Sequence, residues 1–178
     1  YKRQHQDNAD TEDYYGIRVV RRCIYTSTSD NEVTDIEYHD IEFEVGDEPL
    51  LYNKSGLNSA FDLSNDFYQN LYIWSDERIR GKEYILRLKT YYSPDYVSMW
   101  DGSNYKYSYK VYLYKLSREL FCYLKSVNDV KNNDLGHKGL APIRSHYSNV
   151  ENGIGVVGGC RITETEWMDN VSTDINLS

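Results

Sequence analysis

The feature that most constrains the fold is the regular alternation of side chains between Tyr105 and Leu116. Mostly aromatic and aliphatic residues take one set of alternate positions: Tyr105, Tyr107, Tyr109, Val111 and Leu113. The positions between them hold a second set: Lys106, Ser108, Lys110, Tyr112 and Tyr114. Successive side chains of a β-strand point to opposite faces of its sheet, so a period of two predicts a strand. Tyrosine packs well while its hydroxyl can still reach water, which suits a strand with one wet face.

The same period recurs in shorter stretches and predicts more strands. They are Tyr14 to Tyr25, Asp35 to Val45, Leu71 to Trp74 and Glu83 to Tyr92. In the second stretch the apolar phase changes near His39 and Asp40, which predicts a bulge or bend there. Polar turn clusters such as Asp76 to Gly81 separate the strands.

The period changes to about 3.6 after the long tyrosine-rich stretch, which predicts one amphipathic helix. Its apolar stripe consists of Leu116, Leu120, Phe121, Leu124 and Val127. Ser117 is placed to cap the first turn, and Glu119 lies where the helix dipole favours an anion.

These elements predict an all-β fold, an antiparallel β-sandwich or barrel with one short amphipathic helix at about residues 117–129. A chain of 178 residues is most simply one domain. We expect residues 1–13 to form a linker or lead-in and residues 14–178 to form that single domain.

A glycine-rich stretch runs from Gly139 to Trp167 and contains the spacing G-x-G-x-x-G at Gly153, Gly155 and Gly158. Nucleotide binding by this motif requires a strand before the glycines and a helix that opens on them. The preceding segment is polar and turn-like, and the following one alternates with a period of two. We therefore expect a turn at residues 151–153 and then a glycine-rich strand that another part of the chain approaches closely.

Composition excludes some partners. The net charge of −8 argues against nucleic acid, because phosphate binding needs clustered lysine and arginine. No apolar run approaches the length of a membrane-spanning helix. Cys23, Cys122 and Cys160 lack metal-binding spacing and lie in apolar stretches, which predicts packing roles for them. No cofactor is expected.

Four stretches resemble a family of uncharacterised Bacteroidetes cell-envelope proteins, known as a domain of unknown function. They are Asp13 to Tyr15, Tyr72 to Tyr84 (YIWSDERIRGKEY), Val111 to Lys125 (VYLYKLSRELFCYLK) and Pro142 to Gly159 (PIRSHYSNVENGIGVVGG). The resemblance covers nearly the whole chain from Asp13 onward. It implies a secreted outer-membrane lipoprotein, periplasmic or surface-exposed, with this chain as a C-terminal domain. A lipid anchor outside the chain would be its only membrane attachment, and a TonB-dependent receptor system its protein partner. The family has no established activity, so the resemblance implies no catalytic residues.

The sequence leaves two classes of function open. The first is a non-catalytic module that binds an envelope protein or a glycan. Its candidate ligand-binding residues are the aromatic side chains around a polar loop: Tyr91, Tyr92, Tyr96 and Trp100. The alternative for Tyr92 and Trp100 is that they pack at the edge of the sandwich. Trp74 and Trp167 are expected to pack in the core or at its rim. The second class is a hydrolase or metal-dependent enzyme that uses His137 and His146. Their spacing is not typical of zinc, so no metal site is assigned.

Overall fold

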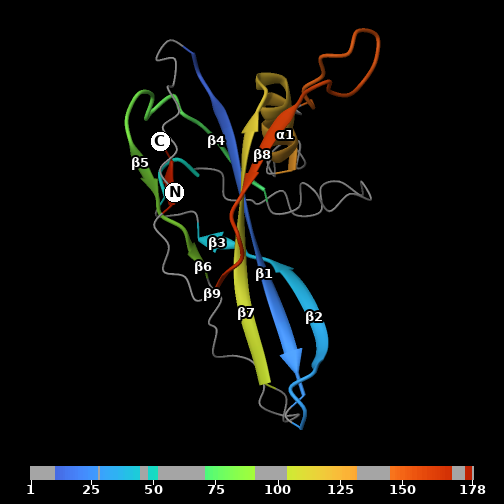
Figure 1. The fold of residues 1–178 in the computed structure, drawn as a ribbon. Helices are drawn as coiled ribbons and strands as arrows, with labels where there is room; N and C mark the ends of the chain where they lie inside the picture. Colours follow the sequence, from blue (N-terminus) through green and yellow to red (C-terminus); the bar gives the residue numbers. More distant parts are fainter. Residues whose placement is uncertain are drawn as a thin grey trace.

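Two long antiparallel strands form the centre of the molecule (Figure 1). The computed structural model describes residues 11–27, 29–44, 48–51, 71–90, 104–131, 145–169 and 175–177. Within these ranges β1 (Tyr14–Thr26) and β7 (Asn104–Leu116) pair along their whole lengths. The register places Ile17 opposite Leu113 and Val19 opposite Val111, so one face of both strands is apolar. The strand predicted from Tyr105 to Leu116 is therefore confirmed as β7.

Shorter strands extend the sheet on both sides. β2 (Val33–Asp40) and β4 (Tyr72–Ser75) pair with β1, while β8 (Cys160–Glu164) and β9 (Met168–Asp169) pair with β7. All these pairings are antiparallel, and the sheet is not closed. The predicted antiparallel β fold with one short helix is confirmed, in an open form.

The strand predicted from Asp35 to Val45 is in fact two strands in different sheets. β2 keeps a regular register with β1 through His39 and Asp40, and the irregularity lies instead between Tyr25 and Thr26, at the other end of the pairing. Ile41 makes the last hydrogen bond to β1, through the carbonyl of Val19, and beyond it β3 (Phe43–Glu44) pairs with β6 (Lys89–Thr90). The phase change in the sequence marks this change of sheet.

The strand predicted from Glu83 to Tyr92 is likewise divided, into β5 (Tyr84–Leu86) and β6. β5 pairs with β10 (Ile175–Leu177) rather than with the partner of β6. Between them the backbone N–H of Arg87 donates to Oε2 of Glu48 at 3.0 Å. A buried carboxylate thus takes a hydrogen bond that a continuous strand would give to a neighbouring strand.

The predicted helix is α1 (Arg118–Lys131). Oγ of Ser117 accepts the N–H of Leu120 at 3.3 Å, so Ser117 caps the first turn as expected. Leu120, Leu124 and Val127 are buried. In the part of the chain that the structure describes, no helix has the length and apolar character needed to cross a membrane.

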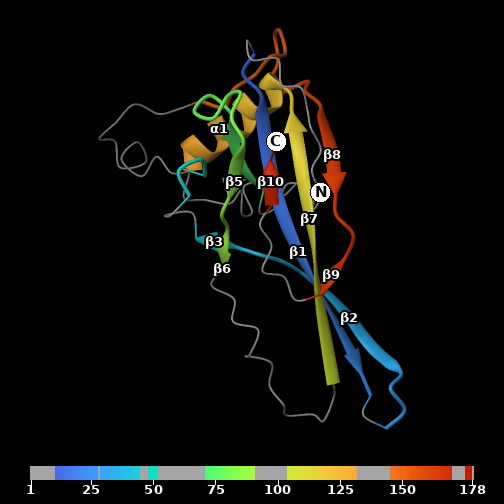
Figure 2. The same ribbon diagram turned by 60° about the vertical axis from the view of Figure 1, so that its left-hand side comes forward.

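The core lies on both faces of the central strands. One cluster contains Ile17, Val19 and Val111, with residues of β3, β4 and β5 packed against them. The other lies between the sheet and α1 and contains Tyr114 and Leu116. Figure 2 shows α1 beside one end of β1 and β7.

The two tryptophans in the described ranges differ in burial, within the roles expected for them. Trp74 belongs to the first cluster and is 3% exposed. Trp167 is half-buried beneath the guanidinium of Arg22, whose Cζ lies 4.4 Å from the ring centroid. Trp74 is therefore a core residue and Trp167 a rim residue.

Candidate functional site

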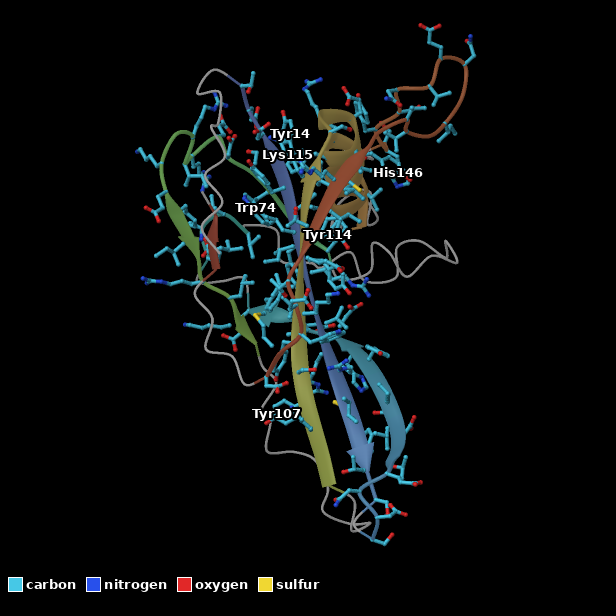
Figure 3. All side chains as sticks on the ribbon, viewed as in Figure 1. Tyr14, Trp74, Tyr107, Tyr114, Lys115 and His146 are labelled. Atoms are coloured by element: carbon cyan, nitrogen blue, oxygen red, sulfur yellow. The ribbon has the colours of Figure 1, made fainter. Side chains whose placement is uncertain are left out.

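Segments from all four stretches of the family resemblance meet at the end of the sheet where α1 begins. The N–H of Asp13 donates to Asp76 Oδ1 at 2.9 Å, and Lys115 Nζ lies 2.7 Å from Asp13 Oδ2. Tyr14 stacks on Phe121 of α1 with ring centroids 4.6 Å apart. Figure 3 shows Tyr14 and Lys115 close to one another at this end. Residues far apart in the chain therefore build one junction.

The glycine-rich stretch joins this junction through backbone contact. Ser117 donates its N–H to the carbonyl of Gly159 at 2.8 Å, and Gly159 donates its own N–H to Ser117 Oγ at 3.2 Å. A Cβ atom at Gly158 would lie 2.9 Å from Cβ of Leu120 and 3.0 Å from its backbone nitrogen. The interpretation of the glycines as a site of close contact is confirmed at Gly158.

The rest of the glycine motif has a different geometry from a nucleotide site. The expected turn is present, with Asn152 in the left-handed region at φ 56°. No strand forms at Gly155 to Gly159, because strand β8 begins only at Cys160. No helix begins at the glycines either, and the nearby first turn of α1 is already capped by Ser117. The predicted glycine-rich strand is thus wrong, and the motif forms a loop.

That loop, Ser148 to Val157, is named here the projecting loop because it extends beyond α1 at the upper right of Figure 1. The side-chain amide of Asn149 joins the two sides of the loop by pairing with both backbone groups of Val157, as the backbone of a neighbouring strand does in a sheet. The side-chain Nδ2 donates to the carbonyl of Val157 at 2.8 Å, and Oδ1 accepts the N–H of Val157 at 2.8 Å. Oγ of Ser148 accepts the N–H of Gly155 at 3.3 Å and donates to the carbonyl of Gly153 at 3.3 Å. The loop therefore has a defined internal hydrogen-bond network.

Apolar side chains lie exposed on this loop. Ile154 is 93% exposed, Val157 76% and Val150 39%. Val156, next to Val157, packs instead against the cluster beneath α1. The loop is therefore anchored at its base and presents aliphatic side chains to solvent at its tip.

Two tyrosines near this junction have pKa values above the ordinary one. Burial raises the pKa of Tyr114, and burial together with a hydrogen bond to Glu12 raises the pKa of Tyr14. Both phenols thus stay protonated at neutral pH, which suits packing and hydrogen bonding. In the described ranges, no group of three His, Cys, Asp or Glu side chains is placed to hold a metal ion.

The residues predicted to form a site are only partly placed by the structure. Tyr91, Tyr92, Tyr96 and Trp100 lie outside the described residues, as does His137. His146 is exposed just before the projecting loop (Figure 3). The aromatic binding site and the histidine site both stay predictions.

The exposed aliphatic residues of the projecting loop are not predicted from the sequence. The glycine spacing predicts the segment and its turn, but not the exposure of Ile154 and Val157. A usable signal was present, since these aliphatic residues lie between glycines where no regular period assigns them to a core. Ser148 and Asn149 also had a recognisable property, because their short polar side chains bond readily to nearby backbone.

Comparison with protein families matches most of the chain to a family model. A family model described as "Domain of unknown function (DUF4249)" matches residues 3–166. No curated protein matches the chain, and no solved structure does. The match includes β1, β7, α1, the projecting loop and β8.

Proposed function

The chain belongs to the family described as Domain of unknown function (DUF4249), and from this premise we propose that it is a non-catalytic interaction module of a cell-envelope lipoprotein. The projecting loop is the surface that binds its protein partner. One observation carries this proposal: Ile154 is 93% exposed at the tip of a loop whose backbone is held by Ser148 and Asn149.

Two physical arguments support the loop as a binding surface. Burial of exposed aliphatic groups against a partner favours binding, by about 25 cal/mol per Å² of apolar area removed from water. A loop already held by its own hydrogen bonds also loses little conformational entropy on binding. An exposed isoleucine on a mobile loop would lack the second advantage.

Photo-crosslinking in bacterial cells that have an outer membrane tests whether the projecting loop binds a protein partner. A benzophenone amino acid replaces Ile154 in one variant and Lys125, an exposed residue of α1, in the control. We expect a discrete crosslinked protein from position 154 and not from position 125. Equal labelling at both positions, or crosslinks to lipid alone, would contradict binding of a protein by the loop.

A second variant separates binding from folding. Ile154→Ser should weaken capture of the crosslinked protein while changing the free energy of unfolding by less than about 0.5 kcal/mol, because the side chain packs against little. Unchanged capture by a folded Ile154→Ser protein would remove the loop from the interface.

The proposed localisation, in the outer membrane as a lipoprotein, is tested separately. Metabolic labelling with an alkyne fatty acid, followed by membrane fractionation of the native protein, should place the labelled protein in the outer membrane. An unlabelled protein in the cytoplasmic fraction would contradict the lipoprotein proposal without affecting the loop.

We also propose that the aromatic residues predicted from the sequence contribute to binding. Trp100→Ala and Tyr96→Ala should weaken binding to the same partner, or to a glycan, while the fold stays intact. A loss limited to glycan binding would assign these residues to a separate surface. The enzyme alternative instead requires a bound metal, which elemental analysis of purified protein and of His137→Ala would detect.

A further inference from the structure

Strand β2 forms an edge of the main sheet. It pairs with β1, and among the described residues no strand pairs with its outer side. Seven of its eight residues are exposed, from Val33 to His39. Figures 1 and 2 both show β2 at the margin of the molecule, at the end opposite α1. The outer edge of β2 is therefore accessible to another chain.

The ladder shows which backbone groups point outward. Ile41 donates its N–H to the carbonyl of Val19 at 2.9 Å, in the same register as the β1–β2 pairing. Because hydrogen-bonded pairs alternate in an antiparallel ladder, the even-numbered residues of β2 point their N–H and C=O groups away from β1. Ile36 agrees with this pattern, since its N–H donates to Oδ1 of Asp35 at 2.8 Å. Among the described residues, no strand pairs with the outward N–H of Tyr38, and that of Ile36 is bonded only to the side chain of its neighbour Asp35, which an added strand would replace.

Edge strands usually carry features that prevent pairing, such as lysine, proline or a bulge in mid-strand. Between Val33 and Asp40 there is no lysine or proline. The one irregularity lies at the hairpin end, opposite Tyr25 and Thr26. Large apolar side chains are exposed instead, with Val33 at 57%, Ile36 at 45% and Tyr38 at 61%. This edge suits strand addition.

Charge indicates the kind of strand that would fit. Five carboxylates lie on β2 or in the turn before it, without a lysine or arginine among them: Asp30, Glu32, Asp35, Glu37 and Asp40. Arg18 pairs with Asp40 at 2.7 Å, and Tyr25 donates to Glu37 at 3.0 Å. The first three face solvent with no cation beside them in the described part of the chain.

We propose that the outer edge of β2 takes up an extended segment of a protein partner as an added strand, with side chains that alternate between basic and apolar. The apolar residues of the added strand lie beside Ile36 and Tyr38, and its basic residues lie beside Asp35 and Glu37. This inference rests on the proposed role as an interaction module, but it uses a surface separate from the projecting loop.

A second copy of the chain is a poorer occupant. Self-pairing centred on Glu37 places that carboxylate opposite itself, and self-pairing centred on Ile36 places Asp35 opposite Glu37. Like charges directly opposite one another destabilise a strand pair. The net charge of −8 also opposes association of two copies.

Synthetic peptides test the proposal directly. The probe is a short capped peptide of alternating lysine and valine, and binding is measured by calorimetry together with amide exchange. One control peptide replaces lysine with glutamate, and another carries N-methyl groups on alternate backbone amides, which block strand pairing while keeping the charge. We expect binding of the lysine peptide alone, with slower exchange at the amides of Ile36 and Tyr38. The N-methylated peptide should bind at least about tenfold more weakly, a loss of about 1.4 kcal/mol.

Matched variants complete the test. Tyr38→Pro removes an outward N–H without removing a β1–β2 hydrogen bond, and Asp35→Asn combined with Glu37→Gln removes two charges from the edge. The control, Glu77→Gln combined with Glu83→Gln, removes two exposed charges that lie neither on β2 nor in the projecting loop. Both edge variants should lose peptide binding, and the control should keep it.

Three results would overturn the proposal. They are equal binding of the N-methylated peptide, binding unchanged in the Asp35→Asn and Glu37→Gln protein, and a dimer in light scattering that Tyr38→Pro disrupts. The last would assign the edge to a second copy. Since these variants leave Ile154 intact, failure here is distinguishable from failure of the loop proposal.

Discussion

Gly158 is where absence of a side chain lets the glycine-rich segment approach α1. A Cβ atom there would meet the backbone nitrogen of Leu120 at 3.0 Å and Oγ of Ser117 at 3.0 Å. Neither neighbour is the flexible end of a long side chain, so the helix or the segment must move. We expect Gly158→Ala to lower the free energy of unfolding by about 1–3 kcal/mol, measured by urea denaturation.

The neighbouring glycine is a matched control. A Cβ at Gly159 would have no atom within 4 Å, so Gly159→Ala should be nearly neutral. A similar loss for both variants would mean that flexibility of the segment, rather than close contact, explains the glycines.

Tyr84 and Glu48 form a polar pair in which the carboxylate is buried. Glu48 is 3% exposed and accepts from the hydroxyl of Tyr84 as well as from the N–H groups of Leu50 and Arg87. Tyr84→Phe removes one of these donors from a buried carboxylate. We expect a loss of about 1–2 kcal/mol in the free energy of unfolding at neutral pH.

The same pair predicts a pH dependence. Burial, with a contribution from the hydrogen bond to Glu48, raises the pKa of Tyr84 from 10.0 to about 12. A pKa raised by folding means that the protonated phenol contributes stability fully below about pH 10 and loses it as the pH rises through about 12. The difference in unfolding free energy between the native protein and Tyr84→Phe should therefore shrink over this interval. A difference that stays constant to pH 12 would contradict the assignment.

At the scale of the elements, the projecting loop depends on side chains that replace backbone pairing. Asn149 provides both a donor and an acceptor to Val157, so Asn149→Ala removes two hydrogen bonds at once. We expect the amide of Val157 to exchange faster, with the local opening free energy lowered by about 1–2 kcal/mol. Amide exchange followed by NMR measures this.

Asn152 supplies the control for the loop. It lies in the same turn at φ 56°, a conformation that glycine adopts readily, so Asn152→Gly should keep the loop closed. If Asn149→Ala leaves exchange at Val157 unchanged, the loop owes its shape to something other than the asparagine amide.

At the scale of the whole molecule, β1 and β7 connect the two core clusters. One cluster lies on each face of this strand pair, so neither can lose its packing without exposing the backbone of both strands. Ile17 is 0% exposed and lies between Leu113 on β7 and Tyr72 on β4. Ile17→Ala should cost about 2–5 kcal/mol, the range for deletion of a large buried aliphatic group.

Unfolding should also be a single event. Trp74 of the first cluster contributes to tryptophan fluorescence, and α1 beside the second cluster contributes to far-ultraviolet circular dichroism. The unfolding transitions followed by these two signals should coincide, both in the native protein and in Ile17→Ala. Val33→Ala, at an exposed edge position, should change stability by less than about 0.5 kcal/mol. Two separate transitions would mean that the clusters fold independently.

The sequence by itself determined the elements whose signal is local. Alternation in Tyr14 to Tyr25 and Tyr105 to Leu116, the apolar stripe of α1 and its cap at Ser117 each depend on the spacing of near neighbours. The period of side-chain direction is a property of the backbone conformation alone, so these elements could be predicted without knowing what they contact.

Only the tertiary structure decided the rest, because the deciding contacts join distant residues. The predicted strand from Glu83 to Tyr92 is divided beside a carboxylate 39 positions from Arg87. The glycines after Asn152 form a loop because Asn149 pairs with Val157 and because Gly158 rests on α1. Which strand is left at the edge, and which aliphatic side chains face water, follow from pairing choices that no local spacing encodes.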